Sequence, residues 1–165
     1  MKTIEMELAL STYFSPRQNL VIPNVSWGFG LHECDLIVLT KAKYLYEIEI
    51  KVSKADLIKD KEKKHQHKSD KIRKLYFAIP EGLQEHTEHI PERAGIIIVG
   101  LYSNGRKWCR KIREAKVNPK APKMTIEDCY KLARLGSLRI WSLKTKIFRL
   151  TKKVKPTKRK RKKKY

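Results

Sequence analysis

The chain has 165 residues, 41% of them hydrophobic, which is enough for one compact domain with a core and too short for two domains of ordinary size. It carries 39 Lys and Arg against 17 Asp and Glu, and the resulting charge of +22 favours a polyanionic partner, most simply nucleic acid. Three widely spaced cysteines without a CxxC pair argue against a disulfide framework and a structural zinc site. We expect a cytoplasmic protein without a membrane partner, because the N-terminus lacks a signal-peptide core and no apolar run spans a bilayer.

Hydrophobic periodicity and capping residues predict a helix, three strands, a second helix and two further strands. We expect Ile4 and Leu8 on the inward face of the first helix, with Met6, Ala9 and Tyr13 as further candidates for that face. Pro23 is typical of an edge strand. Ser53 and Asp56 have the spacing of a capping box that opens the second helix. The expected elements are a helix at 2–14, strands at 19–25, 33–40 and 44–52, a helix from 53 to about 67, and strands at 74–80 and 95–102.

The C-terminal third is less regular. Residues 106–117 suggest a weak basic strand, a helix capped at Thr125 is expected to end near Gly136, and periodicity leaves 138–150 open between helix and strand. Ten of the 22 net charges fall in KKVKPTKRKRKKK (152–164), so the rest of the chain carries +12. The order predicts an α/β fold, a mixed central β-sheet flanked by helices over residues 1–150, with a disordered basic tail at 151–165.

Four carboxylates fall on two of the predicted strands despite the basic composition of the chain: Glu33, Asp35, Glu47 and Glu49. Residues two apart in a strand share a face, so the register of the hairpin decides whether the acidic faces coincide. A three-residue loop at 41–43 would set Asp35 opposite Glu49, whereas a two-residue loop would send them to opposite faces. Opposed carboxylates about 5 Å apart repel each other unless one takes up a proton or a cation lies between them.

The Asp35 strand, the hairpin and the Glu49-x-Lys51 strand before a helix resemble the PD-(D/E)XK nuclease superfamily, although Cys34 stands where its proline is usually written. The stretch EIEIKVSKADLIKDKEKKH followed by KLYFAIP is also similar to small phage and bacterial DNA-repair proteins of that superfamily. The resemblance covers roughly residues 5–100. It implies a restriction-endonuclease-like core in a bacterial or phage-infected cell.

What the resemblance implies is hydrolysis of DNA phosphodiester bonds with Mg²⁺ or Mn²⁺, most simply as an endonuclease in repair, recombination or phage DNA processing. Asp35, Glu49, the carbonyl of Ile50 and Glu7 of the first helix would hold the cation. Lys51 would orient the attacking water or stabilise charge on the phosphate. Possible accessory residues are Glu33, Glu47 and His32.

Basic residues around this motif are candidate DNA contacts. Those on or after the second helix lie beside the predicted site, and the tail would add affinity without specificity. The candidates are Lys54, Lys61, Lys64, His65, Lys68, Arg106, Lys107, Arg110, Lys158, Arg159, Lys160 and Arg161. Two alternatives stay open: a nucleic-acid-binding protein that keeps the nuclease fold without cutting, and a basic ribosome-associated protein. The preferred DNA structure and the oligomeric state, monomer or homodimer, are also open.

Overall fold

The computed structural model describes residues 1–25, 29–62 and 67–153. Six strands form one mixed sheet in the order β1-β2-β3-β4-β5-β6, so each strand lies beside its neighbour in the chain. The contacts β3–β4 and β4–β5 are parallel and the other three are antiparallel. The strands are β1 (Leu20–Val25), β2 (Cys34–Leu39), β3 (Leu45–Ile50), β4 (Ile72–Pro80), β5 (Gly95–Leu101) and β6 (Lys107–Arg113).

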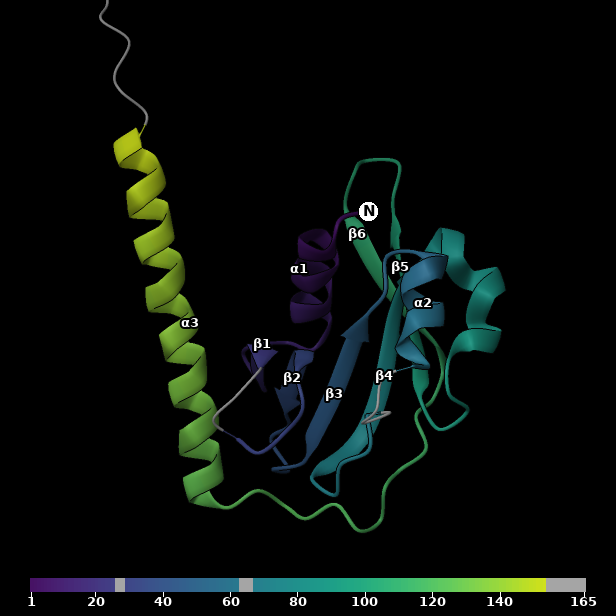
Figure 1. Ribbon diagram of the computed structural model, residues 1–165, viewed down its shortest axis with the longest axis horizontal. Helices are drawn as coiled ribbons and strands as arrows, with labels where there is room; N and C mark the ends of the chain where they lie inside the picture. The colour runs from purple at the N-terminus through teal and green to yellow at the C-terminus, as the bar shows by residue number, and fades with distance from the viewer. Residues whose placement is uncertain (26–28, 63–66, 154–165) are drawn as a thin grey trace, which may run out of the picture.

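Helices cover both faces of this sheet (Figure 1). Helix α1 (Thr3–Tyr13) packs on one face, while α2 (Lys54–Asp60), the 3₁₀ segment η1 (Glu81–His89) and the start of α3 (Ile126–Lys153) pack on the other. The prediction of an α/β fold with a mixed sheet between helices is therefore confirmed. In the described ranges, no helix combines the length and the apolar character that a bilayer crossing needs.

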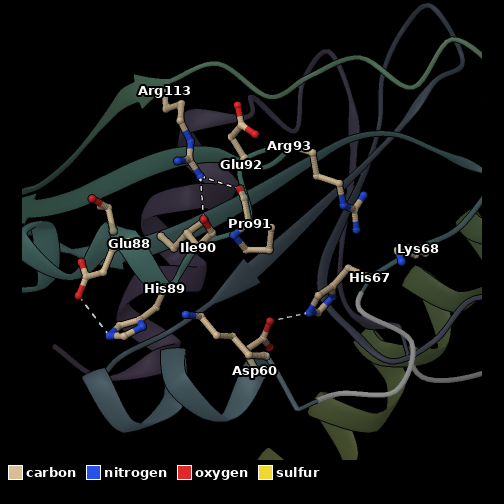
Figure 2. Close-up of a pocket in the computed structure, with 12 residues that line it drawn as sticks. Asp60, His67, Lys68, Glu88, His89, Ile90, Pro91, Glu92, Arg93 and Arg113 are labelled. Carbon is tan, nitrogen blue, oxygen red and sulfur yellow. Dashed lines mark hydrogen bonds and ion pairs between the residues drawn. The ribbon is translucent and has the colours of Figure 1, made fainter.

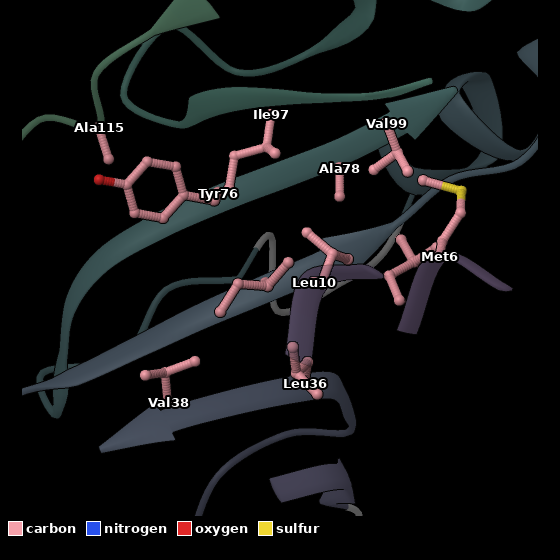
Figure 3. Close-up of a cluster of buried hydrophobic side chains, with 11 residues drawn as sticks. Met6, Leu10, Leu36, Val38, Tyr76, Ala78, Ile97, Val99 and Ala115 are labelled. Carbon is pink, nitrogen blue, oxygen red and sulfur yellow. The ribbon is translucent and has the colours of Figure 1, made fainter. Parts of the chain in front are cut away.

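The core beneath α1 differs from the predicted one. Met6 and Leu10 are fully buried against β2, β3, β4 and β5, whereas Ile4 and Leu8 are 56% and 61% exposed. Figure 3 shows Met6 and Leu10 pointing into this cluster, where Leu36 and Tyr76 meet them from the sheet. The two stripes lie on different sides of the same helix and carry apolar side chains of similar size, so residue type did not distinguish the buried stripe from the exposed one.

The two predicted caps form. The Ser53 hydroxyl accepts a hydrogen bond from the Asp56 N–H at 3.2 Å, and the Thr125 hydroxyl accepts one from the Asp128 N–H at 3.1 Å. The extents of the helices were predicted wrongly, however. Helix α2 ends at Asp60 instead of near residue 67, and α3 continues through Gly136 to Lys153 as one helix of 28 residues.

Only the first part of α3 packs on the sheet. Leu132 and Leu135 are buried with β1 and β2, and Arg139 donates a hydrogen bond to the carbonyl of Asn24. Beyond this point the helix projects past the sheet (Figure 1). Its large apolar side chains there are at least 55% exposed: Ile140, Trp141, Leu143, Ile147, Phe148 and Leu150. Trp141, an aromatic residue of the kind that usually anchors a core, therefore lies at the surface.

Two glycines differ in whether the packing around them leaves room for a side chain. A Cβ on Gly100 of β5 would lie 2.1 Å from the Trp108 ring, while a Cβ on Gly136 would meet Ile22 at 3.8 Å, an ordinary contact. Gly136→Ala should therefore stabilise the protein by roughly 0.5–1 kcal/mol, because alanine is the better helix former. Gly100→Ala should destabilise it. Urea denaturation of both variants measures the two free energies of unfolding, and a destabilised Gly136→Ala variant would contradict a continuous α3.

Candidate metal and nucleic-acid site

The hairpin between β2 and β3 has the three-residue turn on which the predicted site depends. The Thr40 N–H donates to the Tyr44 carbonyl at 2.9 Å, and Lys41 to Lys43 form the turn, with Lys43 in the left-handed region at φ 66°. Leu36 pairs with Ile48 and Leu39 with Leu45. Continued by one residue, this register sets Asp35 opposite Glu49.

Five charged or polar side chains are buried together on the α2 side of β3. Each is at most 5% exposed: Glu47, Glu49, Lys51, Asp60 and His67. The Lys51 ammonium lies 3.0 Å from Glu49 Oε2 and 2.7 Å from Asp60 Oδ1. His67 joins the other two carboxylates, with Nδ1 2.8 Å from Glu47 Oε1 and Nε2 2.8 Å from Asp60 Oδ2. We call these five residues the β3 cluster.

The β3 cluster is held by charge compensation. Burial by itself would lower the pKa of His67, but hydrogen bonds to Asp60 and Glu47 and the nearby Glu49 charge raise it to about 9, so both ring nitrogens donate at neutral pH. Burial would raise the pKa of Glu47, yet hydrogen bonds from His32 and His67 hold it below its ordinary value. The pKa of Asp60 is likewise lowered, against the effect of burial, by His67 and Lys51.

His32 extends the β3 cluster toward the surface. Its side chain is 11% exposed, and Nε2 lies 2.6 Å from Glu47 Oε1, the oxygen that also contacts His67. The second carboxylate oxygen, Glu47 Oε2, is buried, and none of the described residues forms a hydrogen bond with it. A buried carboxylate oxygen without a hydrogen-bond donor is costly, and a bound cation would remove that cost.

Asp35 lies beside the β3 cluster in an irregular part of β2. Its Oδ2 accepts a hydrogen bond from the Ile50 N–H at 2.7 Å, so the carboxylate takes the place of a strand carbonyl. The register of β1 and β2 places Asn24 opposite Asp35, and Asn24 has a left-handed backbone with φ 52°. Across this point the alternation of faces breaks, because Cys34 packs with Ile37 on the α2 side of the sheet. Strained backbone of this kind is often found at functional sites.

The other predicted carboxylates lie outside the β3 cluster. Glu7 belongs to α1, on the opposite face of the sheet, where burial raises its pKa and a hydrogen bond with Asn24 opposes that effect. It therefore approaches the Asp35 end of β2 through Asn24. Glu33 is exposed and precedes β2.

A pocket of about 560 Å³ opens beside the β3 cluster (Figure 2). Asp60 and His67 form part of its wall, and the predicted DNA contacts Lys61 and Lys68 line it together with Arg93. Figure 2 shows the Asp60–His67 hydrogen bond at this wall. The pocket therefore brings cationic side chains beside Asp60 and His67, the two members of the β3 cluster that line it.

The remaining predicted DNA contacts are spread over the molecule. Lys54 is exposed at the start of α2, and Arg110 is exposed on β6. Arg106 and Lys107 line a hollow formed with α1, away from the pocket described above. Trp108 packs over Gly100, consistent with a core role. Residues outside the described ranges are Lys64, His65, Lys158, Arg159, Lys160 and Arg161.

Asp60 and His67 are the members of the β3 cluster that sequence reasoning missed. Neither was named as a candidate, because the helix was expected to continue to about residue 67 and the basic residues around it were interpreted as DNA contacts. The signal was KDKEKKHQHK itself, where two acids and two histidines interrupt a run of lysines. Helix α2 instead ends at Asp60, and His67 has a left-handed backbone with φ 54°, which returns its ring to β3.

Two groups of side chains have the spacing of metal ligands. In each group the ligand atoms lie within 4.8 Å of one another. One group is Glu47, Glu49 and His67, and the other is His32, Cys34 and Glu47. Both depend on Glu47, which the sequence analysis gave only an accessory role.

Comparison with known proteins finds a structure with a similar fold and gives no function for the site. No protein-family model and no curated protein matches the chain. A solved structure, SPO1766 protein of unknown function from Silicibacter pomeroyi, matches with a TM-score of 0.66 at 17% identity, covering 87% of this chain and 92% of that chain. The chain therefore shares its fold with that protein.

Removal of the buried ammonium tests the charge compensation. Lys51→Met should lower the free energy of unfolding of the metal-free protein by about 3–5 kcal/mol, because Glu49 and Asp60 lose their shared cation inside the protein. Chemical denaturation in the presence of a chelator provides the measurement. Lys111→Met is the matched control, since Lys111 pairs with Glu114 at the surface and should contribute less than about 1 kcal/mol. Equal effects in the two variants would contradict the arrangement.

Proposed function

We propose that this protein is a metal-dependent DNA nuclease of the PD-(D/E)XK type. The observation that carries the proposal is the buried Glu49-x-Lys51 pair with the Asp35 carboxylate 2.7 Å from the intervening Ile50 N–H. The element order helix, three strands, helix, strand is the one on which the sequence resemblance rests. The net charge of +22 supplies the attraction for DNA.

The donor set fits a divalent cation. Glu47 and Glu49 offer carboxylate oxygens and His67 offers Nδ1, while the bond from Nε2 to Asp60 fixes the orientation of the imidazole ring. A metal-binding histidine is typically held in this way by a carboxylate on its other nitrogen. Because the set includes an imidazole, it suits Mn²⁺ better than Mg²⁺, which prefers oxygen ligands and retained water. When bound, the cation would polarise the scissile phosphate and lower the pKa of a water molecule.

The protein's own groups position the reaction. Lys51 is held between Glu49 and Asp60, so its ammonium sits at a fixed place beside the ligand carboxylates, where it can orient water or stabilise charge on a phosphate. Asp35 fixes the backbone of Ile50 between the two motif residues. Lys61, Lys68 and Arg93 line the adjacent pocket and would bind flanking phosphates.

A second candidate function is a DNA-binding protein that has this fold but no nuclease activity. It is favoured by the degree of burial, since Glu49 and Lys51 are 1% and 3% exposed and Lys51 is engaged by two carboxylates. In that case the β3 cluster is a structural ion network. Calorimetric titration with Mn²⁺ and Mg²⁺ separates the two, because only the nuclease requires binding at millimolar or lower concentration.

Cleavage of a panel of linear, nicked, forked and four-way-junction DNAs tests the nuclease. Glu49→Ala should lower the Mn²⁺-dependent cleavage rate at least about 100-fold, since several kcal/mol of transition-state stabilisation are lost with the metal. Asp35→Ala should lower it by a similar factor, because the backbone between Glu49 and Lys51 loses its hydrogen bond to the Asp35 carboxylate. DNA binding, measured by fluorescence anisotropy, should persist. The exposed Glu33 supplies the control, and Glu33→Gln should cut at the wild-type rate. Undiminished cleavage in both alanine variants would overturn the site assignment.

A further inference from the structure

We infer that His32, Cys34 and Glu47 form a second metal site, selective for a thiophilic divalent transition metal such as Zn²⁺. This site goes beyond the proposed nuclease activity and shares only Glu47 with the donor set described above. The ligand atoms are an imidazole nitrogen, a thiol sulfur and a carboxylate oxygen, all within 4.8 Å of one another. Cysteine and histidine ligands select zinc and related ions over Mg²⁺.

The three ligand atoms lie near enough to one another for one ion to reach all of them. Zinc lies about 2.0–2.3 Å from nitrogen, oxygen and sulfur ligands, so tetrahedral ligands of one ion are about 3.3–3.8 Å apart. The ligand atoms lie within 4.8 Å of one another, and His32 Nε2 lies 2.6 Å from Glu47 Oε1, so the imidazole would move back from that oxygen to admit the ion. In the metal-free state the Cys34 thiol donates to the His32 carbonyl at 3.2 Å, which already holds the sulfur beside the histidine. The thiol proton passes to water when the sulfur binds the metal.

The burial pattern also fits a metal site. Cys34 and Glu47 are fully buried, whereas the His32 side chain is 11% exposed and provides a route of entry. Glu47 Oε2 is a buried acceptor with which none of the described groups forms a hydrogen bond. A carboxylate this deeply buried normally has its oxygens bonded, and a cation held by His32, Cys34 and Glu47 would satisfy this one.

The irregularity in β1 and β2 brings the sulfur to this face. In a regular strand Cys34 would point with Leu36 toward α1, but it packs with Ile37 on the side of Glu47. The break occurs at Asp35, opposite the left-handed Asn24. The backbone is thus shaped so that one carboxylate, Glu47, faces His67 on one side and His32 and Cys34 on the other.

Cobalt provides a direct probe of the cysteine ligand. The full-length protein, freed of metal by a chelator, is titrated with Co²⁺ while near-ultraviolet absorption is recorded. We expect a thiolate-to-cobalt charge-transfer band that saturates as the site fills and disappears when Zn²⁺ is added. Cys34→Ser and Cys34→Ala should abolish the band, and His32→Gln should weaken Co²⁺ binding at least about 10-fold.

Matched variants make the result specific. Cys109→Ser and Cys129→Ser leave the proposed ligands intact and should keep the band. Glu49→Gln should also keep it while abolishing DNA cleavage, so failure of the nuclease proposal and failure of this site are distinguishable. Circular dichroism and thermal melting confirm that each variant is folded. Absence of the band in the wild type, or its persistence in both folded Cys34 variants, would overturn the inference.

Discussion

The burial of three carboxylates on one face of the sheet is the constraint on which the rest of the site depends. Glu47, Glu49 and Asp60 are each at most 5% exposed, and so much negative charge is tolerated only when cations lie among it. Lys51 and a protonated His67 supply them in the metal-free state. Because these cations come from β3 and from the segment after α2, the ionic contacts determine where that segment must return.

This constraint also explains how the same residues can serve two states. The contacts that lower the pKa of Glu47 and Asp60 are made by hydrogen-bond donors that a metal ion could replace. In the proposed nuclease, one backbone would therefore serve both the metal-free and the metal-loaded protein. The positive charge elsewhere on the chain would then attract the polyanion toward this site.

The sequence was sufficient to predict the contacts that depend on strand periodicity. The three-residue turn predicted at 41–43 is present, and the register that it sets extends to the pair Leu36 and Ile48. Beyond that pair the Asp35 carboxylate accepts a hydrogen bond from the Ile50 N–H. The sequence was not sufficient to predict contacts where the backbone departs from regular strand or helix geometry. The left-handed conformations of Asn24 and His67 decide that Cys34 and His67 join the carboxylates, and neither residue is a glycine that would signal such a conformation.

The errors in the helices have a different cause. Glycine often ends a helix, but α3 continues through Gly136. There the packing of Leu132 and Leu135 against Ile22 outweighs the low helix propensity of glycine. In α1 the buried stripe is the one that fits the sheet, Met6 and Leu10, and the outward stripe is equally apolar. Tertiary contacts therefore determine where α3 ends and which face of α1 is buried, and local sequence did not distinguish these alternatives.

The projecting half of α3 gives this protein two opposite responses to ionic strength. Its exposed apolar residues, among them Trp141 and Phe148, favour self-association, while the positive charge of the chain keeps molecules apart. Added salt screens that repulsion and at the same time weakens attraction to phosphate. Under the proposed function, high salt would release the protein from DNA and would also favour association of its copies, so purification at high salt and assays at low salt would observe different populations of the same chain.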